Sequence, residues 1–524
     1  MEHSRHPGIR MPRRQFLKMT AGTAAIVGTA AACGGSTQSA TTNASAGSPK
    51  RGGTLTAALT GGDSSDTLDG QNAVNNVDFA RVAQLFDTLL VWSPGVVPQP
   101  SLAEEMVPNA DATEWVIRLR QGIVCHDGKD FTSADVIYSF QRILNPKKPL
   151  AAAVILAPID VAGLKAVDKY TVKVPCKTPF ASFRSAAANQ GIYMVPAGFD
   201  PNKPNGTGPF KFHTFTPGQT STFVRNENYW QSGLPYLDAV IMTDFADQTS
   251  QLNALDSGQA QIVNLLSADA ISGVQSGGNH VLISPGGGAG PLTMRVDQPP
   301  FNDVRVRQAM RLIVDRPQMR DLVFGGHGEI ANDIFSVWDP EYDHSLPQRH
   351  QDLEQAKFLL KAAGQEGLTV QLTTSNISQG SSETAQVFAQ QAKGAGVNVQ
   401  LQQLTVTNFF TGYLKFLFAE DFWFYSPYLI QVAETIVPGA YFNPTHWNNA
   451  RYNSLYAQAL QAVDPQRQTE IVHEMMTIDY NEGGYIIPLV PPVIDGYSAR
   501  FHGAVPSKTG ISFNNYDLRR SWLD

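Results

Sequence analysis

The chain has 524 residues, of which 42% are hydrophobic, 16% are charged and 10% are aromatic. This composition excludes a disordered or collagen-like polymer, and at roughly 150 residues per domain the length suffices for about three domains. The formal net charge of −7 lacks the basic excess that nucleic acid requires, so we expect no nucleic-acid partner.

Residues 1–32 have the pattern of an export signal peptide. They hold five basic residues and one acid, which leaves the remainder with 34 basic and 45 acidic residues, a balance of −11. A small, mildly apolar stretch from Met19 to Ala32 follows the basic head and is too short to span a bilayer of roughly 30 Å. Residues 13–18 (RRQFLK) resemble the twin-arginine signal, with the Sec route as the alternative.

The signal peptide ends in a motif for lipid attachment. Ala30-Ala31-Ala32-Cys33-Gly34 resembles the lipobox of bacterial lipoproteins, except that this box prefers Leu at the position of Ala30. We expect Cys33 to be lipidated, and the alternative is a small buried cysteine. Residues 33–50 then form a Ser/Thr/Ala/Gly-rich flexible tether, which holds an exported body at the outer face of the cytoplasmic membrane. No later segment has about 18 consecutive apolar residues, so we expect no transmembrane helix.

Strands and helices alternate irregularly after the tether, without an internal repeat. A strand is predicted at Thr54–Leu59, and a half-buried strand at Glu114–Arg120, where alternate residues are apolar. Thr132 is placed to cap a helix with an apolar side at Val136, Phe140, Ile143 and Leu144. Later helices are predicted after Asp303, from Asp352 to Gly364, at Tyr452–Val463 and at Pro465–Asn481. The mixture indicates an α/β or α+β protein.

Two further cysteines lie at or beside predicted strands, Cys125 in 122–125 and Cys176 after 172–175. Because an extracytoplasmic compartment permits disulfides, they are candidates for a pair. Two buried free thiols are the alternative.

Signatures of catalysis are missing from the sequence. His473-Glu474 lacks the second histidine of a zinc helix, and the glycine runs at 286–288 and 325–328 lack the context of a phosphate-binding loop. No Gly-x-Ser-x-Gly motif occurs. We therefore expect no enzyme, no metal site and no cofactor.

Several blocks of sequence occur in the order found in one known family. They are LAEE at 102–105, WVIRLRQGIVCHDGKDFTSADV at 115–136, GTGPF at 206–210, RNENYW at 225–230, PFNDVRVRQAM at 300–310, EQAKFLLKAAG at 354–364 and GGYIIPL at 483–489. Together they resemble the family 5 extracellular solute-binding proteins of bacteria, the peptide and nickel receptors of ABC importers. Cys125 replaces the usual aromatic residue of the second block.

The resemblance implies a two-lobed α/β fold of the periplasmic-binding-protein type II class, with a hinged cleft. Lobe 1 would comprise 51–297, with an extra subdomain at about 85–200 and a return at 495–524. Lobe 2 would comprise 298–494, and the chain would cross between the lobes near 296–301 and 488–495. The implied partner is an ABC permease, and we expect a monomer.

Candidate ligand contacts follow from the same resemblance. Family peptide receptors hold the ligand's amino group with an Asp in a Trp-x-x-Asp-Tyr-x-Asp-Pro-like segment. The comparable stretch, DFWFYSPY at 421–428, lacks the Asp after its Trp. The aromatic candidates for stacking on a ligand are Trp423, Tyr425, Tyr428 and Trp447. The turn after the first strand adds Thr60, Gly61 and Asp63. Core packing is the alternative for each aromatic residue.

The sequence thus predicts a receptor that binds di- or oligopeptides, or a similar polar solute, in the interlobe cleft. Oligosaccharides are the second choice of ligand because of the aromatic segment and the missing Asp. Metal chelates are the third, since no tight His/Cys cluster is present. A secreted hydrolase is a remote alternative that only the carboxylates and the export signal favour.

Overall fold

The computed structural model describes residues 48–524 except residue 74. The predicted signal peptide, Cys33 and nearly all of the predicted tether lie outside the described residues. Within the described part, no helix combines the length and the apolar character needed to cross a bilayer. Three larger sheets organise this part, and each has helices and a hydrophobic core of its own.

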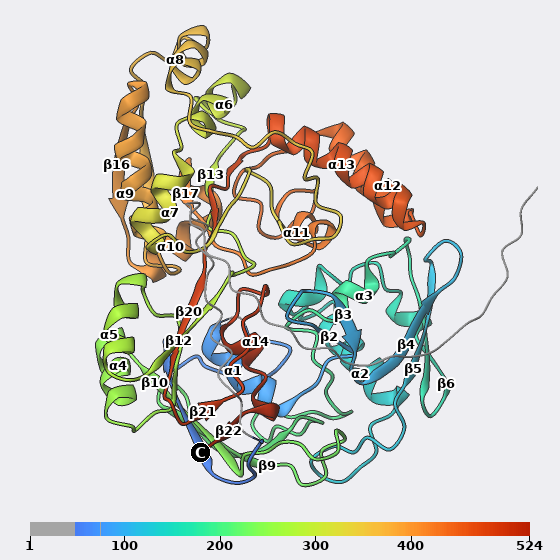
Figure 1. The fold of residues 1–524 in the computed structure, drawn as a ribbon. Helices are drawn as coiled ribbons and strands as arrows, with labels where there is room; N and C mark the ends of the chain where they lie inside the picture. The colour runs from blue at the N-terminus through green and yellow to red at the C-terminus, as the bar shows by residue number, and fades with distance from the viewer. Residues whose placement is uncertain (1–47, 74) are drawn as a thin grey trace, which may run out of the picture. The chain divides into compact units, whose positions relative to one another are not determined.

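A seven-stranded sheet combines β1, near the start of the described chain, with β20, about thirty residues before its end (Figure 1). Its order is β12 (His280–Ser284), β20 (Val493–Tyr497), β11 (Ile262–Val263), β1 (Thr54–Thr60), β10 (Ala239–Phe245), β9 (Thr220–Arg225) and β8 (Phe210–Thr216). The strand predicted at 54–59 is therefore confirmed as β1, which pairs in parallel with β10 and β11. Its helices are α1 (Asn76–Leu85), α4 (Gln248–Asp256), α5 (Ile271–Ser276) and α14 (Ser512–Tyr516), and a small ribbon pairs β21 (Phe501–His502) with β22 (Trp522–Leu523).

A four-stranded antiparallel sheet lies between α1 and β8 in the chain. Its order is β4 (Ala103–Pro108), β5 (Glu114–Leu119), β7 (Thr171–Pro175) and β6 (Lys165–Asp168), with β2 (Leu90–Trp92) and β3 (Pro98–Pro100) paired beside it and helices α2 (Ser133–Ile143) and α3 (Phe183–Ala186). The alternation predicted for β5 is confirmed, because Trp115, Ile117 and Leu119 are buried. Thr132 caps α2 in a capping box with Asp135.

The predicted strand at 122–125 is wrong. A single bridge between Val124 and Asp130 forms there, because the Cys125 amide donates to the Lys129 carbonyl across a tight turn that includes Gly128. The turn leaves no room for a longer ladder.

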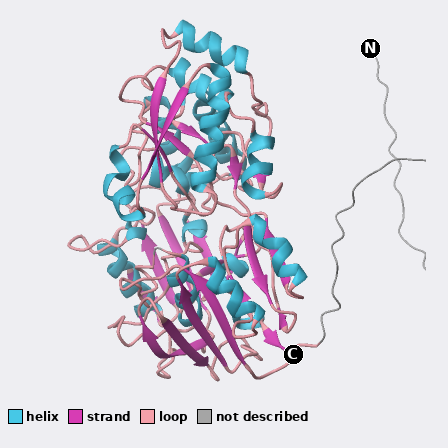
Figure 2. Cartoon of the chain, turned by 90° about the vertical axis from the view of Figure 1, so that its left-hand side faces the viewer, coloured by secondary structure: helices cyan, strands magenta, loops and turns pink. Residues whose placement is uncertain are grey.

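A five-stranded sheet organises the second half of the chain (Figure 2 shows strands in magenta and helices in cyan). Its order is β16 (Asn398–Gln403), β15 (Thr369–Thr374), β17 (Phe418–Glu420), β13 (Leu292–Met294) and β18 (Tyr485–Ile486). Its helices are α6 (Val304–Leu312), α7 (Arg316–Phe324), α8 (Leu353–Ala362), α9 (Ser381–Ala392) and α10 (Val406–Gly412). The helices predicted after Asp303 and from Asp352 are confirmed as α6 and α8, and these two residues are their N-caps.

A further core lies among α11 (Tyr428–Thr435), α12 (Ala450–Gln461) and α13 (Pro465–Glu482). Helices α12 and α13 confirm the last two predicted helices. The short strands β14 (Glu329–Ile330) and β19 (Leu489–Val490) pair beside it.

Within the described residues, the chain passes between the seven-stranded and the five-stranded sheets twice. It leaves the seven-stranded sheet after β12 and enters the five-stranded sheet at β13, through residues 285–291. It returns from β18 to β20 through residues 487–492. Since only these two passages join the two sheets, they are where a hinge would bend.

Candidate functional site

The aromatic segment, residues 421–426 (DFWFYS), follows β17 and is held on two sides. Its Trp423 exchanges two backbone hydrogen bonds with Ala289 of the first passage, at 2.9 and 2.8 Å. The Tyr425 amide donates to the Thr509 carbonyl at 3.2 Å. The segment therefore lies at the junction of the first passage and the C-terminal part of the chain.

Two rings of the aromatic segment pack against residues from the first half of the chain. Tyr425 is 5% exposed and meets Trp92 of β2 edge to face, with ring centroids 5.6 Å apart. Phe424 meets Phe79 of α1 in the same way at 5.7 Å. These two ring contacts connect the second half of the chain to the first half at positions outside the two passages.

The Trp423 ring is half-buried and stands beside a buried acid. Its indole Nε1 donates to Asp421 Oδ2 at 2.9 Å, and its ring lies 5.7 Å from that of Phe442. Burial raises the pKa of Asp421 to about 7, although hydrogen bonds from Tyr413 and Trp423 oppose the shift. No acid follows Trp423 in the segment, but Asp421, two residues before it, lies beside its indole ring.

Tyr428 and Trp447 belong to the core around α11–α13. Tyr428 is fully buried, and its hydroxyl shares a 2.9 Å hydrogen bond with that of Tyr452. The Trp447 ring lies 4.9 Å from the Tyr452 ring. Neither residue lines the pocket that opens between α1 and β2. Core packing, the alternative to ligand contact for the aromatic candidates, therefore describes both residues.

The turn after β1 is fixed by side chains of the neighbouring strands and helices. The Thr60 amide donates to Asn264 Oδ1 and its hydroxyl to Gln251 Oε1, both at 2.8 Å. Gly61 has a φ of +105°, which favours glycine. Asp63 is exposed, and the hydroxyl and amide of Ser65 lower the pKa of Asp63 by donating to it. None of the three residues lines the pocket between α1 and β2.

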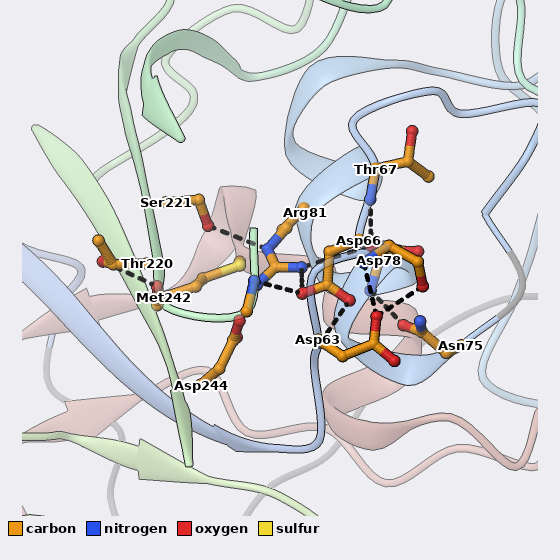
Figure 3. Close-up of polar contacts among 12 residues, drawn as sticks. Asp63, Asp66, Thr67, Asn75, Asp78, Arg81, Thr220, Ser221, Met242 and Asp244 are labelled. Atoms are coloured by element: carbon orange, nitrogen blue, oxygen red, sulfur yellow. Dashed lines mark hydrogen bonds and ion pairs between the residues drawn. The ribbon is translucent and has the colours of Figure 1, made fainter. Parts of the chain in front are cut away.

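A buried charged cluster lies next to this turn, where Asp66 Oδ1 accepts from the Asp63 amide at 3.1 Å (Figure 3). We call it the Arg81 cluster; it comprises Arg81, Asp66, Asp78 and Asp244. The Arg81 guanidinium is fully buried and lies 2.8 Å from Asp66, 3.3 Å from Asp78 and 2.5 Å from Asp244. One cation thus faces three carboxylates. Burial raises the pKa of Asp78 and of Asp244 to about 6, with the Arg81 charge opposing both shifts.

A pocket opens between the end of α1 and β2. Its charged lining residues are Asp87, Asp517 and Arg519, and Trp92 joins it to the aromatic segment through Tyr425. Burial raises the pKa of Asp87, although Arg519 and hydrogen bonds from Trp230 and Thr207 oppose this. The pocket presents both signs of charge beside an aromatic ring, which suits a polar solute.

One wall of this pocket is a left-handed turn of the backbone. Residues 513–516 (FNNY) have φ values between +48° and +63°, although none is glycine. Such residues cost about 1–2 kcal/mol each and persist only where the surroundings hold them. Here Gln190 Nε2 donates to Asn515 Oδ1, and Asp495 accepts from the Phe513 amide. No sequence signal marked this turn.

Three glycines allow the first passage to pack closely. A Cβ at Gly286 would lie 1.8 Å from the Pro491 carbonyl oxygen. At Gly287 it would lie 1.7 Å from the Lys508 carbonyl oxygen, and at Gly288 1.7 Å from that of Trp423. The sequence identified this run only as a loop. Its role is to let three backbone segments meet where the chain changes sheets.

Cys125 and Cys176 are free thiols in the structure, the first buried and the second partly buried. Burial raises the pKa of each to about 12, so both are protonated at neutral pH. The disulfide stays a prediction. Among residues 48–524, apart from 74, no group of three or more His, Cys, Asp and Glu side chains is arranged to hold a metal ion.

Comparison with known proteins places the chain. The model of bacterial extracellular solute-binding proteins, family 5 (middle) matches residues 97–428. The chain belongs to this family. The glutathione-binding protein GsiB of Escherichia coli (strain K12) is 25% identical over 485 residues, which cover 87% of this chain and 93% of GsiB. Members of the family are the substrate-binding components of ABC importers, so this family member is an extracytoplasmic solute receptor and not an enzyme.

Solved structures agree on the fold. The binding protein AgaA of A. tumefaciens R10, in complex with agropinic acid, has a TM-score of 0.78 at 23% identity and covers 90% of this chain and 99% of its own. DppA of Helicobacter pylori, in complex with the peptide STSA, has a TM-score of 0.78 at 19% identity, with 90% and 98% covered. This family member therefore has the two-lobed fold that the sequence predicts.

Proposed function

We propose that the protein binds a di- or oligopeptide, or a similar polar solute, between its lobes and delivers it to an ABC permease. Family membership supports the receptor role. The observation that carries the choice of site is the aromatic segment, whose Tyr425 packs on Trp92 at the edge of the pocket between α1 and β2. Aromatic faces and mixed charge recognise peptide side chains and ends.

The proposed lobes follow the sheets. Lobe 1 is 51–297 with the subdomain at about 85–200 and the return at 495–524, and lobe 2 is 298–494. Most strands of the seven-stranded and four-stranded sheets fall in the first assignment and most strands of the five-stranded sheet in the second, but β13 (Leu292–Met294) belongs to the five-stranded sheet and moves the first crossing from 296–301 to 285–291. The hinge would lie in the passages 285–291 and 487–492. Ligand contacts to both lobes would then favour the closed state.

The proposed ligand contacts are Trp423 and Tyr425, together with the turn at Thr60, Gly61 and Asp63. The test begins with mass spectrometry of the solute released from natively exported protein, followed by calorimetric titration of that solute. Trp423→Ala and Tyr425→Ala should each weaken binding by about tenfold or more while the far-UV circular dichroism is kept. Unchanged affinity in both variants would refute this placement.

The proposed membrane anchor is a lipid on Cys33, which holds the protein at the outer face of the cytoplasmic membrane. The lipobox-like sequence around it supports this. Expressed full chain should yield a mature protein that begins at an acylated Cys33 by mass spectrometry and fractionates with membranes. Cys33→Ser should leave the chain unacylated and unattached; membrane attachment of that variant would count against the tether.

An oligosaccharide is the second candidate ligand. The half-buried Trp423 ring supports it, since sugar rings stack on exposed aromatic faces. Thermal unfolding with peptide and oligosaccharide mixtures separates the two, because only a bound ligand raises the transition temperature.

A further inference from the structure

The pocket between α1 and β2 lies next to the aromatic segment and is larger than a water site. Its volume is about 60 Å³. One buried water needs about 10–15 Å³, so the pocket has room for a group of several heavy atoms but not for a whole solute. Trp92 from its wall packs on Tyr425. Asn189, which precedes the wall residue Gln190, donates to Ser426 Oγ at 3.4 Å. A solute held at the aromatic segment therefore has the pocket within reach of one of its ends.

A buried tyrosine hydroxyl in this pocket has no partner among the described residues. Tyr193 is 7% exposed and lines the pocket, and no hydrogen bond reaches its hydroxyl from the described part of the chain. Burial raises the pKa of Tyr193, and the Asp87 charge raises it further, so the hydroxyl stays protonated at neutral pH. It can donate one hydrogen bond and accept others. Since buried polar groups are nearly always hydrogen-bonded, this hydroxyl indicates a partner that the chain itself does not supply.

Unused donors and an unused acceptor line the same pocket. Arg519 uses Nε for Asp517 and Nη1 for the Tyr229 hydroxyl, whereas its Nη2 has no partner among the described residues. Asn515 already accepts a hydrogen bond through Oδ1, but its Nδ2 is unused in the described part of the chain. Asn514 Oδ1 is buried and also lacks a described partner. The pocket therefore offers donors and an acceptor at once.

The charges around the pocket are already engaged with other side chains. Asp517 accepts from Arg519, which also lies 4.0 Å from Asp87. Asp87 accepts from three further side chains, those of Thr207, Tyr229 and Trp230. An anionic group in the pocket would face two carboxylates, and a cationic group would face the guanidinium, each without a free counter-charge. A neutral group avoids both penalties.

The turn at 513–516 is a strained part of the pocket wall. All four of its residues have φ values of +48° to +63° without being glycine. Strain of this kind persists only where the surroundings hold it, and it concentrates at ligand-binding sites. The turn carries Asn514 and Asn515 into the lining of the pocket. Its position therefore agrees with a binding role for this wall.

We propose that this pocket binds a neutral group of the solute that both donates and accepts hydrogen bonds, namely a pair of hydroxyls or a carboxamide. The proposal rests on the proposed function, because the rest of the solute is held at the aromatic segment. The Tyr193 hydroxyl accepts a hydrogen bond from the group, while Arg519 Nη2 and Asn515 Nδ2 donate to its oxygen. An ammonium lacks an acceptor and a carboxylate lacks a donor, so neither satisfies the pocket.

The first test compares neutral and charged probes of similar size on the purified exported protein. Propane-1,2-diol, propionamide, propionate and propylammonium are titrated at pH 7 by ligand-observed NMR. We expect the diol or the amide to bind with a dissociation constant of about 1–10 mM, an affinity that so few heavy atoms allow. The two ions should bind at least about tenfold more weakly. Tighter binding of the diol would assign a hydroxylated solute, and tighter binding of the amide an amide-bearing one.

The second test removes only the Tyr193 hydroxyl. Tyr193→Phe should weaken the bound neutral probe about 3- to 10-fold, because one neutral hydrogen bond is lost. The matched control is Tyr342→Phe, which should bind as the unmodified chain does. Tyr342 is 9% exposed and its hydroxyl also lacks a described partner, but this residue does not line the pocket. Equal binding of a charged probe, no binding of either neutral probe, or unchanged binding by Tyr193→Phe would overturn the subsite. The pocket would then hold water only.

Failure of the subsite and failure of the receptor give different results. Release of a solute, and thermal unfolding with peptide and oligosaccharide mixtures, are measured on the same preparations. If the neutral probes bind through Tyr193 but no solute is released and no mixture raises the transition temperature, the subsite stands and the proposed function fails. If a mixture raises the transition temperature while neither neutral probe binds, the receptor stands and the subsite fails.

Discussion

The Arg81 cluster leads to a sharp prediction about pH. The pKa values of Asp78 and Asp244 are raised by burial to about 6 from an ordinary value of 3.8. A carboxyl group whose pKa is higher in the folded than in the unfolded chain stabilises the fold fully below the unfolded pKa, and this contribution is lost as the pH rises through the folded pKa. The cluster should therefore lower the free energy of unfolding between about pH 4 and pH 7.

The perturbation is Asp244→Asn, which removes one of the three negative charges around Arg81 and keeps an oxygen that accepts from it. A shift of about two pKa units corresponds to about 3 kcal/mol as an upper bound. Since the carboxylates are coupled through one guanidinium, we expect a smaller gain, about 1–2 kcal/mol in the free energy of unfolding at pH 8. At pH 5, where the wild-type carboxyl is largely protonated, the variant should gain nothing.

The assay is urea unfolding at pH 5 and pH 8, followed by circular dichroism. Asp269→Asn, at an exposed position, is the control and should change neither curve. Arg81→Met should lower stability by about 3–5 kcal/mol, and by more at pH 8 than at pH 5, because it leaves three buried carboxylates without a cation. The reasoning fails if Asp244→Asn destabilises the protein equally at both pH values.

Three further predictions concern packing and chemistry. Tyr428→Phe loses the hydrogen bond to Tyr452 and should lower the free energy of unfolding by about 1 kcal/mol in urea, with the affinity for the released solute unchanged; a large loss of affinity would mean that Tyr428 meets the ligand. Gly287→Ala should weaken that solute at least about fivefold by calorimetry, since its Cβ would lie 1.7 Å from the Lys508 carbonyl oxygen; wild-type affinity would show that the passage adapts freely. The thiols of Cys125 and Cys176, with a pKa of about 12, should alkylate slowly in the native protein at pH 8; a mass lower by two hydrogens in exported protein would show the disulfide instead.

Local rules predicted much of the fold. Thr132 was predicted to cap a helix, and helices were predicted after Asp303 and from Asp352; all three residues occupy N-cap positions. Alternation identified β5, since a strand buried on one face repeats every two residues. The resemblance supplied the two-lobed arrangement, which no local rule contains.

The site depended on contacts that sequence patterns do not encode. Aromatic content singled out Tyr425 and Tyr428 alike, but the start of α11 puts Tyr428 in a core while the extended segment before it carries Tyr425 to Trp92. The left-handed turn at 513–516 has no glycine to mark it. Tyr193 attracted no attention in the sequence, because only the fold shows that its buried hydroxyl lacks a partner among the described residues.

On the proposed function, recognition and closure use the same segment. The Trp423 backbone is hydrogen-bonded to Ala289 in the first passage. The Tyr425 amide is hydrogen-bonded to the Thr509 carbonyl, and the Tyr425 ring packs on Trp92. A solute can favour the closed state only by as much as its contacts differ between the open and closed states. A solute that contacts both the aromatic segment and the first half of the chain should therefore promote closure more than a solute that contacts only one of them.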